Sequence, residues 1–256
     1  MKPFLLLQSR PEADAAQNEY EAMCQYGQLK PHQLQRLALN HNELNDNLNL
    51  NDYSGLIIGG GPANITDPPE IKATRTYQPV LYRLLKRIIA ADFPLLGACL
   101  GVGLITDVLG GQISTEYGEP VGPVAVTLTA SAASDPLLAG LPKQFDAFVG
   151  HHEGCAVPPK QAVVLAGSAA CPVQMFRVGQ NVYATQFHPE LDPHGLALRI
   201  QIYKHHGYFQ PDEVDRLTTM AHSANVVYPE HILRRFIERY RQPTQQPTRT
   251  TTTVVH

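Results

Sequence analysis

The sequence predicts an α/β protein of three layers, in which a doubly wound, mostly parallel central sheet lies between helices on both faces and carries an added antiparallel β extension. Two observations predict the parallel part: short apolar runs of strand length alternate with segments of helical period, and glycine-rich turns follow two of those runs. A third observation predicts the extension, because after Gly111 several short strands follow one another with turn residues between them.

The elements of the parallel part follow in order along the chain. Three apolar runs are predicted to form buried strands: Phe4–Leu7, Leu56–Ile58 and Phe93–Leu96. Apolar residues at helical spacing predict the helices that follow these strands, within residues 12–26, 81–89 and 104–109. The Asn-rich stretch 40–52 is expected to be a loop or a weak helix.

The elements of the extension are shorter. Runs rich in β-branched and aromatic residues predict strands at residues 124–129, 145–149, 163–165, 173–178 and 182–187. Two helices are expected after them, around residues 196–203 and 232–240. We expect one domain over residues 1–241, of which about 193–241 are C-terminal helices, and a disordered Pro/Thr/Gln-rich tail over residues 242–256.

The composition argues against several classes of protein. The chain has 256 residues, 43% hydrophobic and 17% charged, which is enough apolar surface for one well-filled core. Its formal net charge of −3 argues against a nucleic-acid partner, which normally requires a basic stripe. No apolar run is long enough to cross a membrane or to form a signal peptide, and the four cysteines form no C-x-x-C pair. We therefore expect a reduced, cytoplasmic protein without a membrane partner.

A nucleophile elbow is predicted at Cys99. The run Leu95–Gly101 reads as a strand, a small residue, a cysteine, a small residue and a helix, which is the elbow pattern with Cys in place of Ser. A sharp turn would expose the sulfur, and small residues at Gly97 and Gly101 would let that turn pack. The N-terminus of the following helix would lower the pKa of the thiol, and the N–H of Leu100 would hold a developing oxyanion.

Two further segments strengthen this interpretation. Gly59–Pro62 follows a strand and could supply a second oxyanion donor. The alternatives for this loop are a simple tight turn or a phosphate-binding loop, and no G-K-[ST] follows that would make it a P-loop. Thr185–Glu190 offers a histidine two residues from a carboxylate. His188 could act as a base toward Cys99, with Glu190 orienting the ring.

These ordered motifs resemble the class I glutamine amidotransferase family. Gly97–Gly101, the later Gln186–Glu190 and the Gly59–Pro62 loop stand in the order of that family and at similar spacing. Two more runs resemble the glutaminase domain of GMP synthetase: Gly150–Glu153 and Ala170–Val173. The resemblance covers about residues 50–192 and is specific because three motifs occur together.

The resemblance implies a cytosolic glutaminase, for which no cofactor is expected. Cys99 would attack the side-chain amide of glutamine and form a γ-glutamyl thioester, which water then hydrolyses to glutamate. His188 would carry the proton to the leaving ammonia and then activate the water, and Glu190 would hold the imidazole. Ammonia would pass to an acceptor activated elsewhere.

The same match assigns the binding groups and exposes one departure. The N–H groups of Gly61 and Leu100 would form the oxyanion hole, and Gly150 and His151 would lie along the α-amino and carboxylate end of the substrate. The family usually reads G-x-C-x-G-x-Q, and the glutamine that hydrogen-bonds the amino-acid end of the substrate is Gly103 here. Loss of a hydrogen bond to a charged group, worth about 1.5–3 kcal/mol, would weaken the binding of free glutamine about tenfold or more.

Three functions stay open. The first is a glutaminase that works with a separate synthetase subunit, because no ATP-pyrophosphatase or ATP-grasp segment follows Glu190. The second is a γ-glutamyl hydrolase that acts on another γ-glutamyl compound with the same triad. The third is a catalytically silent regulatory subunit of the same fold, against which the intact set of Cys99, His188 and Glu190 counts.

A metal site is the remaining chemical alternative. The candidate ligands are close in sequence: His188, Glu190, Asp192 and His194, with His151, His152 and Glu153 in addition. Pro189 and Pro193 break the regular spacing that a shared face would need, so we expect no catalytic metal.

Overall fold

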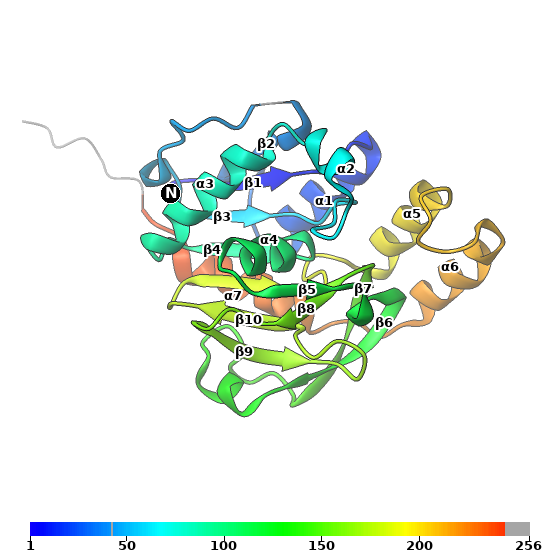
Figure 1. Ribbon diagram of the computed structural model, residues 1–256. Coiled ribbons are helices and arrows are strands. Elements are labelled where there is room, and N and C mark those ends of the chain that lie inside the picture. The colour runs from blue at the N-terminus through cyan, green and yellow to red at the C-terminus, as the bar shows by residue number, and fades with distance from the viewer. Residues whose placement is uncertain (42, 244–256) are drawn as a thin grey trace, which may run out of the picture.

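A nine-stranded mixed sheet runs through the centre of the computed structural model, which describes residues 1–41 and 43–243 (Figure 1). Five strands pair in parallel, in the order β2 (Leu34–Ala38), β1 (Phe4–Gln8), β3 (Gly55–Ile58), β4 (Leu95–Ala98) and β11 (Val182–Thr185). From β11 the sheet continues through antiparallel pairs to β10 (Met175–Val178), β9 (Ala162–Gly167), β6 (Glu119–Leu128) and β7 (Gln144–His151).

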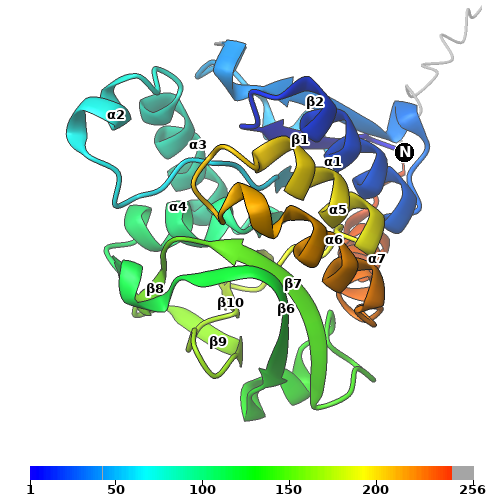
Figure 2. The same ribbon diagram turned by 90° about the vertical axis from the view of Figure 1, so that its right-hand side faces the viewer.

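Helices cover both faces of the parallel half (Figure 2). One face carries α2 (Pro69–Ala73), α3 (Gln78–Ala90) and α4 (Leu100–Val108), and the other carries α1 (Ala13–Tyr26) and α7 (Pro229–Tyr240). The alternation of side chains along β1 explains this arrangement. Leu5 and Leu7 share a core cluster with residues of α3 and α4, whereas Phe4 and Leu6 share one with residues of α1 and α7. All of β1 is therefore buried, as a parallel strand between two helical layers must be.

The carboxyl ends of the parallel strands meet at one edge of the sheet. The helices α5 (Pro193–Tyr203) and α6 (Val214–Ser223) lie across this edge (Figure 2). Their apolar residues Leu196, Ile200 and Leu217 pack with Phe148 of β7 in a third core cluster. Ligands of open α/β sheets bind at this edge, so α5 and α6 cover the place where a site is expected.

The predicted three-layer α/β architecture is confirmed, with some differences in detail. The stretch 182–187, predicted within the antiparallel extension, forms β11, which pairs in parallel with β4 on one side and antiparallel with β10 on the other. It therefore joins the two halves of the sheet. The pattern missed β2 and also a two-stranded sheet of β5 (Gln112–Ser114) and β8 (Gly154–Val157), because these runs are short and lack a clear alternation.

The C-terminal boundary lies close to its predicted place. The backbone of Gln242 is hydrogen-bonded to Lys2 and to the Ser54 hydroxyl, so the chain is still attached to the domain there. The remainder of the predicted tail, residues 244–256, lies outside the described residues. In the described part of the chain, no helix has both the length and the apolar character that a membrane span requires.

Candidate active site

Cys99 lies at the turn between β4 and α4. Its backbone has a φ of 49° and a ψ of −85°, an uncommon conformation for a residue with a side chain. The N–H of Cys99 donates to the carbonyl oxygen of Thr185 at 2.7 Å, which attaches the turn to the end of β11. Strain of this kind costs about 1–3 kcal/mol and persists only where the surroundings enforce it, which is typical of a nucleophile elbow.

The two glycines beside the turn have different roles. A Cβ at Gly97 would lie 2.8 Å from the Cα of Gly101, so position 97 requires a glycine for the turn to pack against the first turn of α4. A Cβ at Gly101 would meet nothing within 4 Å. The predicted need for a small residue is therefore borne out at Gly97, whereas Gly101 matters through the close approach to its Cα.

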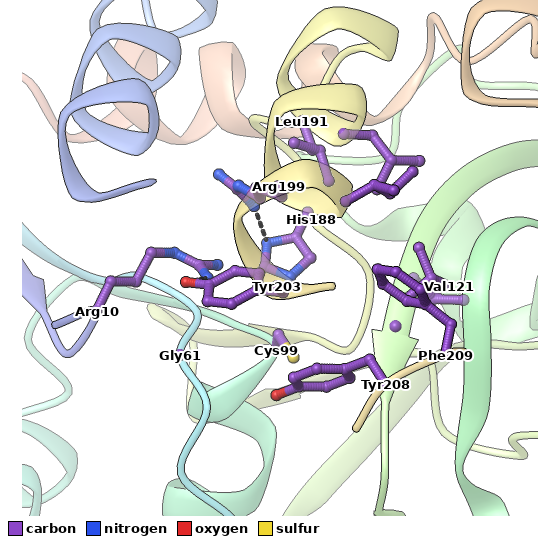
Figure 3. Close-up of a pocket in the computed structure, with 14 residues that line it drawn as sticks. Arg10, Gly61, Cys99, Val121, His188, Leu191, Arg199, Tyr203, Tyr208 and Phe209 are labelled. Atoms are coloured by element: carbon purple, nitrogen blue, oxygen red, sulfur yellow. Dashed lines mark hydrogen bonds between the residues drawn. The ribbon is translucent and has the colours of Figure 1, made fainter. Parts of the chain in front are cut away.

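His188 and Glu190 follow β11, the strand next to β4. His188 Nδ1 lies 2.9 Å from Glu190 Oε1, and both side chains are buried. Because the carboxylate accepts a proton from Nδ1, the lone pair of the neutral ring is on Nε2. The imidazole and Cys99 line the same cavity, and Figure 3 shows the ring and the sulfur facing into it. Parallel pairing of β4 with β11 thus brings the two segments to one end of the sheet.

A buried network of charges surrounds this pair. Arg199 of α5 donates to the same Glu190 oxygen at 3.0 Å, and Arg10 donates to Glu19 at 2.9 Å and to the hydroxyl of Tyr203 at 2.9 Å. The sequence analysis missed both arginines. Arg199 stands three residues after Leu196 and one before Ile200, on the apolar face of a predicted helix, and a charge at that position could have indicated a buried partner.

The protonation of the pair differs from the predicted thiolate. Burial raises the pKa of Cys99 to about 11, and nearby Glu190 adds to the rise, so the helix N-terminus does not produce a low pKa. Burial also holds the pKa of His188 below its ordinary value, against the opposing effect of Glu190. Burial alone would raise the pKa of Glu190, but His188 and Arg199 outweigh it and the pKa is lowered. The resting groups are therefore a neutral thiol, a neutral imidazole and a carboxylate.

The predicted binding residues gather around a second cavity that also reaches Cys99. The residues Gly61, Leu100, Gly103, Gly150 and His151 all line it. Leu100 is the first residue of α4, so its N–H has no partner within the helix. The backbone at these positions is therefore placed around the sulfur, as the elbow pattern predicts.

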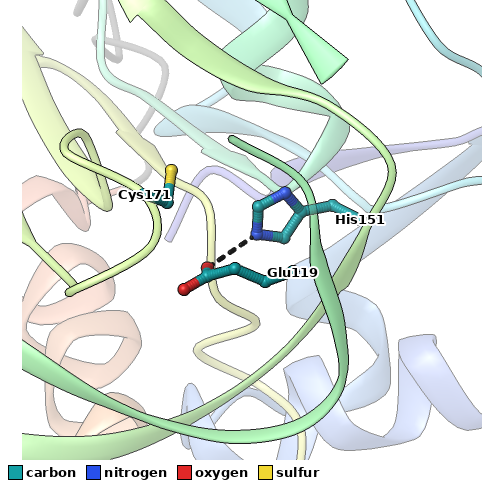
Figure 4. Close-up of side chains that lie close together, drawn as sticks. All are labelled: Glu119, His151 and Cys171. Carbon is teal, nitrogen blue, oxygen red and sulfur yellow. Dashed lines mark hydrogen bonds and ion pairs between the residues drawn. The ribbon is translucent and has the colours of Figure 1, made fainter. Parts of the chain in front are cut away.

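The His151 ring itself is engaged elsewhere. Nδ1 lies 2.8 Å from the carbonyl oxygen of Glu153, and Nε2 lies 2.9 Å from Oε2 of Glu119, so both nitrogens are placed to donate (Figure 4). Glu119 also accepts hydrogen bonds from Ser168 and Gln174. Burial would raise the pKa of Glu119, but the hydrogen bonds from His151 and Ser168 lower it overall. Position 151 can therefore offer a substrate its backbone rather than its ring.

Cys171 lies next to the same pair, with its thiol 3.6 Å from the carbonyl oxygen of Val173 (Figure 4). Burial raises the pKa of this thiol to about 12, and both carboxylate oxygens of Glu119 already accept hydrogen bonds. The cluster is thus a hydrogen-bonded support behind the second cavity. Among the predicted metal candidates, Asp192 caps α5 instead, accepting from the N–H of Gly195 at 2.6 Å.

Gly103 lies beside Ile65 and Glu153. A Cβ there would be 2.9 Å from Cγ1 of Ile65 and 3.3 Å from Oε1 of Glu153. Glu153 in turn accepts from the N–H of Ile65 at 2.7 Å and from the N–H and hydroxyl of Thr66 at 2.8 and 2.7 Å. The space that a longer side chain at position 103 would need is therefore occupied by a tightly held loop.

Tyr208, in the loop between α5 and α6, was not predicted. It lines both cavities beside Cys99, and its ring stacks on His152 with the centroids 4.5 Å apart (Figure 3). The loop carries no pattern that distinguishes it from an ordinary connection, so only the tertiary structure reveals that it reaches the sulfur.

Comparison with known proteins gives a consistent result. A model of the family described as glutamine amidotransferase class-I matches residues 17–200. A glutamine-hydrolyzing subunit of the GMP synthase of Halobacterium salinarum is 33% identical over 141 residues, which cover 55% of this chain and 68% of that protein. The glutamine-hydrolyzing GMP synthase of Thermomicrobium roseum is 31% identical over 137 residues, 54% of this chain and 23% of that protein. The match thus spans about a quarter of the full-length synthases.

Solved structures share the fold over nearly the whole chain. A glutamine amidotransferase from Thermotoga maritima superposes with a TM-score of 0.74 at 19% identity, covering 94% of this chain and 98% of that one. One from Methylobacillus flagellatus gives 0.72 at 20% identity, covering 96% and 98%. The family model spans well over half of the sequence, and the chain therefore belongs to the class-I glutamine amidotransferase family.

Proposed function

We propose that this protein hydrolyses the side-chain amide of glutamine at Cys99 and releases ammonia for a separate synthetase. The observation that carries the proposal is the elbow itself. A cysteine with positive φ stands between a strand and a helix, and it shares a cavity with a histidine whose Nδ1 is held by a buried carboxylate. Membership of the class-I glutamine amidotransferase family supports the same chemistry.

The protonation states support a concerted first step. With a neutral thiol and a neutral imidazole at rest, His188 takes the proton from Sγ as the sulfur attacks the amide carbon. Glu190 stabilises the imidazolium that forms. The backbone N–H groups of Gly61 and Leu100 hold the oxyanion, and His188 returns the proton to the nitrogen as the C–N bond breaks. Water then hydrolyses the γ-glutamyl thioester to glutamate.

A separate partner would receive the ammonia. The relatives with matching sequence are full-length GMP synthases, of which this chain matches about a quarter, or shorter GMP synthase subunits, of which it matches about two thirds. By analogy, activation of the acceptor belongs to another polypeptide or domain. A GMP synthetase-type protein is the first partner to test, because the resemblance in the Gly150–Glu153 region points to that branch of the family.

A second candidate is hydrolysis of another γ-glutamyl compound. The observation that favours it is Gly103, which lacks the side chain that would bind the amino-acid end of glutamine, while Ile65 and Glu153 occupy the adjacent space. The catalytic groups are the same for both candidates, so only the leaving group differs.

The test is a glutamate-release assay combined with labelling. A diazo-ketone analogue of glutamine should alkylate Cys99 and abolish activity, and Cys99→Ala should lose both labelling and activity. Label distributed over Cys24, Cys155 and Cys171 would contradict the assigned nucleophile. If the wild-type protein and Cys99→Ala are equally inactive with every γ-glutamyl compound and with candidate synthetases, the protein is a silent member of the family, which overturns the proposal.

A further inference from the structure

Two cavities meet at Cys99, and only one of them is explained by glutamine. Both are lined by Gly61, Cys99, Gly150 and Tyr208. The cavity described above, with Gly103 and the His151 backbone, would hold the γ-glutamyl part of a substrate. The other lies on the side of His188 and extends beneath α5 and the following loop (Figure 3). An enzyme that only releases ammonia has no evident use for it.

We propose that this second cavity, which we name the amine pocket, binds the leaving group of the substrate, and that the leaving group is an α-amino acid with an apolar side chain. The protein would then hydrolyse γ-glutamyl amino acids. This inference rests on the proposed function, because it uses the same Cys99 thiol. It differs from glutamine hydrolysis only in what leaves with the nitrogen.

The position of the base determines which side the leaving group takes. His188 lines the amine pocket but not the other cavity, and it must protonate the departing nitrogen. In acylation, the Sγ–C bond forms and the C–N bond breaks, while the thiol proton passes through His188 to the nitrogen, and the free amino acid departs. In deacylation, water adds to the thioester, the C–S bond breaks, and the proton that His188 takes from water returns to the sulfur. The products are glutamate and the amino acid.

The walls of the amine pocket are mainly apolar. They include Val121 of β6, Leu196 and Ile200 of α5, and Phe209 of the next loop. These side chains would bury the aliphatic or aromatic body of a leaving group, whereas ammonia offers no such surface. Binding energy gained there can be used at the reacting carbon, which would offset the contact missing at Gly103.

The charges in the pocket favour a carboxylate over a second ammonium. Arg10 and Arg199 line it, whereas no aspartate or glutamate of the described chain does. Their partners, Glu19 and Glu190, are fully buried behind them. Arg10 uses Nε for Glu19 and Nη1 for Tyr203, while its Nη2 lies toward Gly60, beside the His188 ring. A carboxylate near Nη2 would meet a guanidinium, and a diamine would meet two cations without an acidic partner.

The layout also suits a branched leaving group. Figure 3 shows Arg10 on one side of Cys99 and His188, and Val121 with Phe209 on the other. An α-amino acid carries a carboxylate and a side chain on the same carbon, so its two branches can reach both sides. Part of this wall, Tyr208 and Phe209, comes after residue 200, where the match to the family model ends. The pocket is therefore completed by a segment that the family match does not include.

The first experiment compares three substrates of the full-length protein. We would measure glutamate release from γ-glutamyl-leucine, glutamine and γ-glutamyl-1,4-diaminobutane, with Cys99→Ala as the blank. The expected kcat/KM for γ-glutamyl-leucine is at least tenfold above that of either alternative. If glutamine or the diamine derivative is hydrolysed as well as γ-glutamyl-leucine, the inference is overturned while the proposed function stands. If no compound gives Cys99-dependent glutamate, the proposed function fails first.

The second experiment changes the pocket at Phe209, a partly exposed loop residue. Phe209→Ala removes apolar wall and should lower the ratio of kcat/KM for γ-glutamyl-leucine to that for glutamine at least fivefold. Phe209→Glu adds the missing acid and should raise the ratio of the diamine derivative to γ-glutamyl-leucine at least tenfold. Ratios that stay unchanged in both variants would place the leaving group elsewhere and contradict the inference.

Discussion

Gly60 lies directly against the imidazole of His188. A Cβ at position 60 would overlap Cε1 of that ring and would lie 2.8 Å from Nη2 of Arg10. The ring is fixed on its other side by Glu190, so it cannot turn away without losing its hydrogen bond. The glycine-rich loop after β3 therefore sets the position of the base, in addition to any oxyanion donor that it supplies.

Replacing Gly60 tests this contact. Gly60→Ala should displace the imidazole by about 1 Å and lower kcat/KM for glutamate release about 100-fold, since misplacement of that size is enough to disrupt a reacting geometry. The matched control is Gly101→Ala, where a Cβ meets nothing within 4 Å, and its kcat/KM should stay within about threefold of wild type. Equal losses in both variants would mean that the contact with His188 is not the cause.

The pH dependence of kcat/KM should report a base that is unusually easy to keep neutral. His188 must be deprotonated to accept the thiol proton, and burial holds its pKa below the ordinary value of about 6.5. Activity should therefore fall only below pH 6.5 and stay level between pH 7 and 9, since the thiol pKa is about 11. A profile whose acid limb is centred above pH 7 would contradict this assignment.

Arg199 should tune that profile through its charge. It lies 3.3 Å from His188 Nδ1 and 3.0 Å from Glu190, and its positive charge lowers the pKa of His188. Arg199→Met should move the acid limb to higher pH and lower the free energy of unfolding by about 3–5 kcal/mol, because a buried ion pair loses one partner. Arg199→Lys keeps the charge and should keep the acid limb in place. Urea unfolding and pH profiles of both variants provide the check, and an unmoved limb in Arg199→Met would contradict the prediction.

Restoring the residue that the family usually carries at position 103 should require a second change. Gly103→Gln alone places its Cβ 2.9 Å from Cγ1 of Ile65, so it should not lower KM for glutamine. Gly103→Gln combined with Ile65→Ala removes that clash, and one hydrogen bond to the charged end of the substrate should lower KM about tenfold. A tenfold gain in the single variant would show that Ile65 does not restrict the pocket.

Local sequence signals predicted the part of the fold and site that depends on short segments. The strand–glycine–helix pattern around Cys99 and the apolar runs before it predicted the elbow and the parallel strands, which the structure bears out. The His188–Glu190 contact could be predicted because both residues lie in one short turn. Strand β2 could not be predicted, because its half-exposed residues carry little periodicity.

Properties that depend on distant segments could not be predicted in this way. The thiol pKa follows from how much protein surrounds Cys99, and the helix N-terminus alone suggested the opposite direction. Arg10, Arg199 and Tyr208 reach the site from three separate elements, and each looks ordinary in its local context. The pairing of β11 with β4 likewise depends on the whole sheet, because its run has the same alternation as the neighbouring antiparallel strands.

The place of β11 has a consequence for how the protein matures in the cell. Cys99 leaves the ribosome well before Val182–Thr185, the segment that fixes its turn from the adjacent strand. All the antiparallel strands are synthesised in between, and such non-local pairing is intrinsically slow to form. A nascent or truncated chain therefore carries a thiol without its base, and catalytic competence arises only when translation and closure of the sheet are nearly finished.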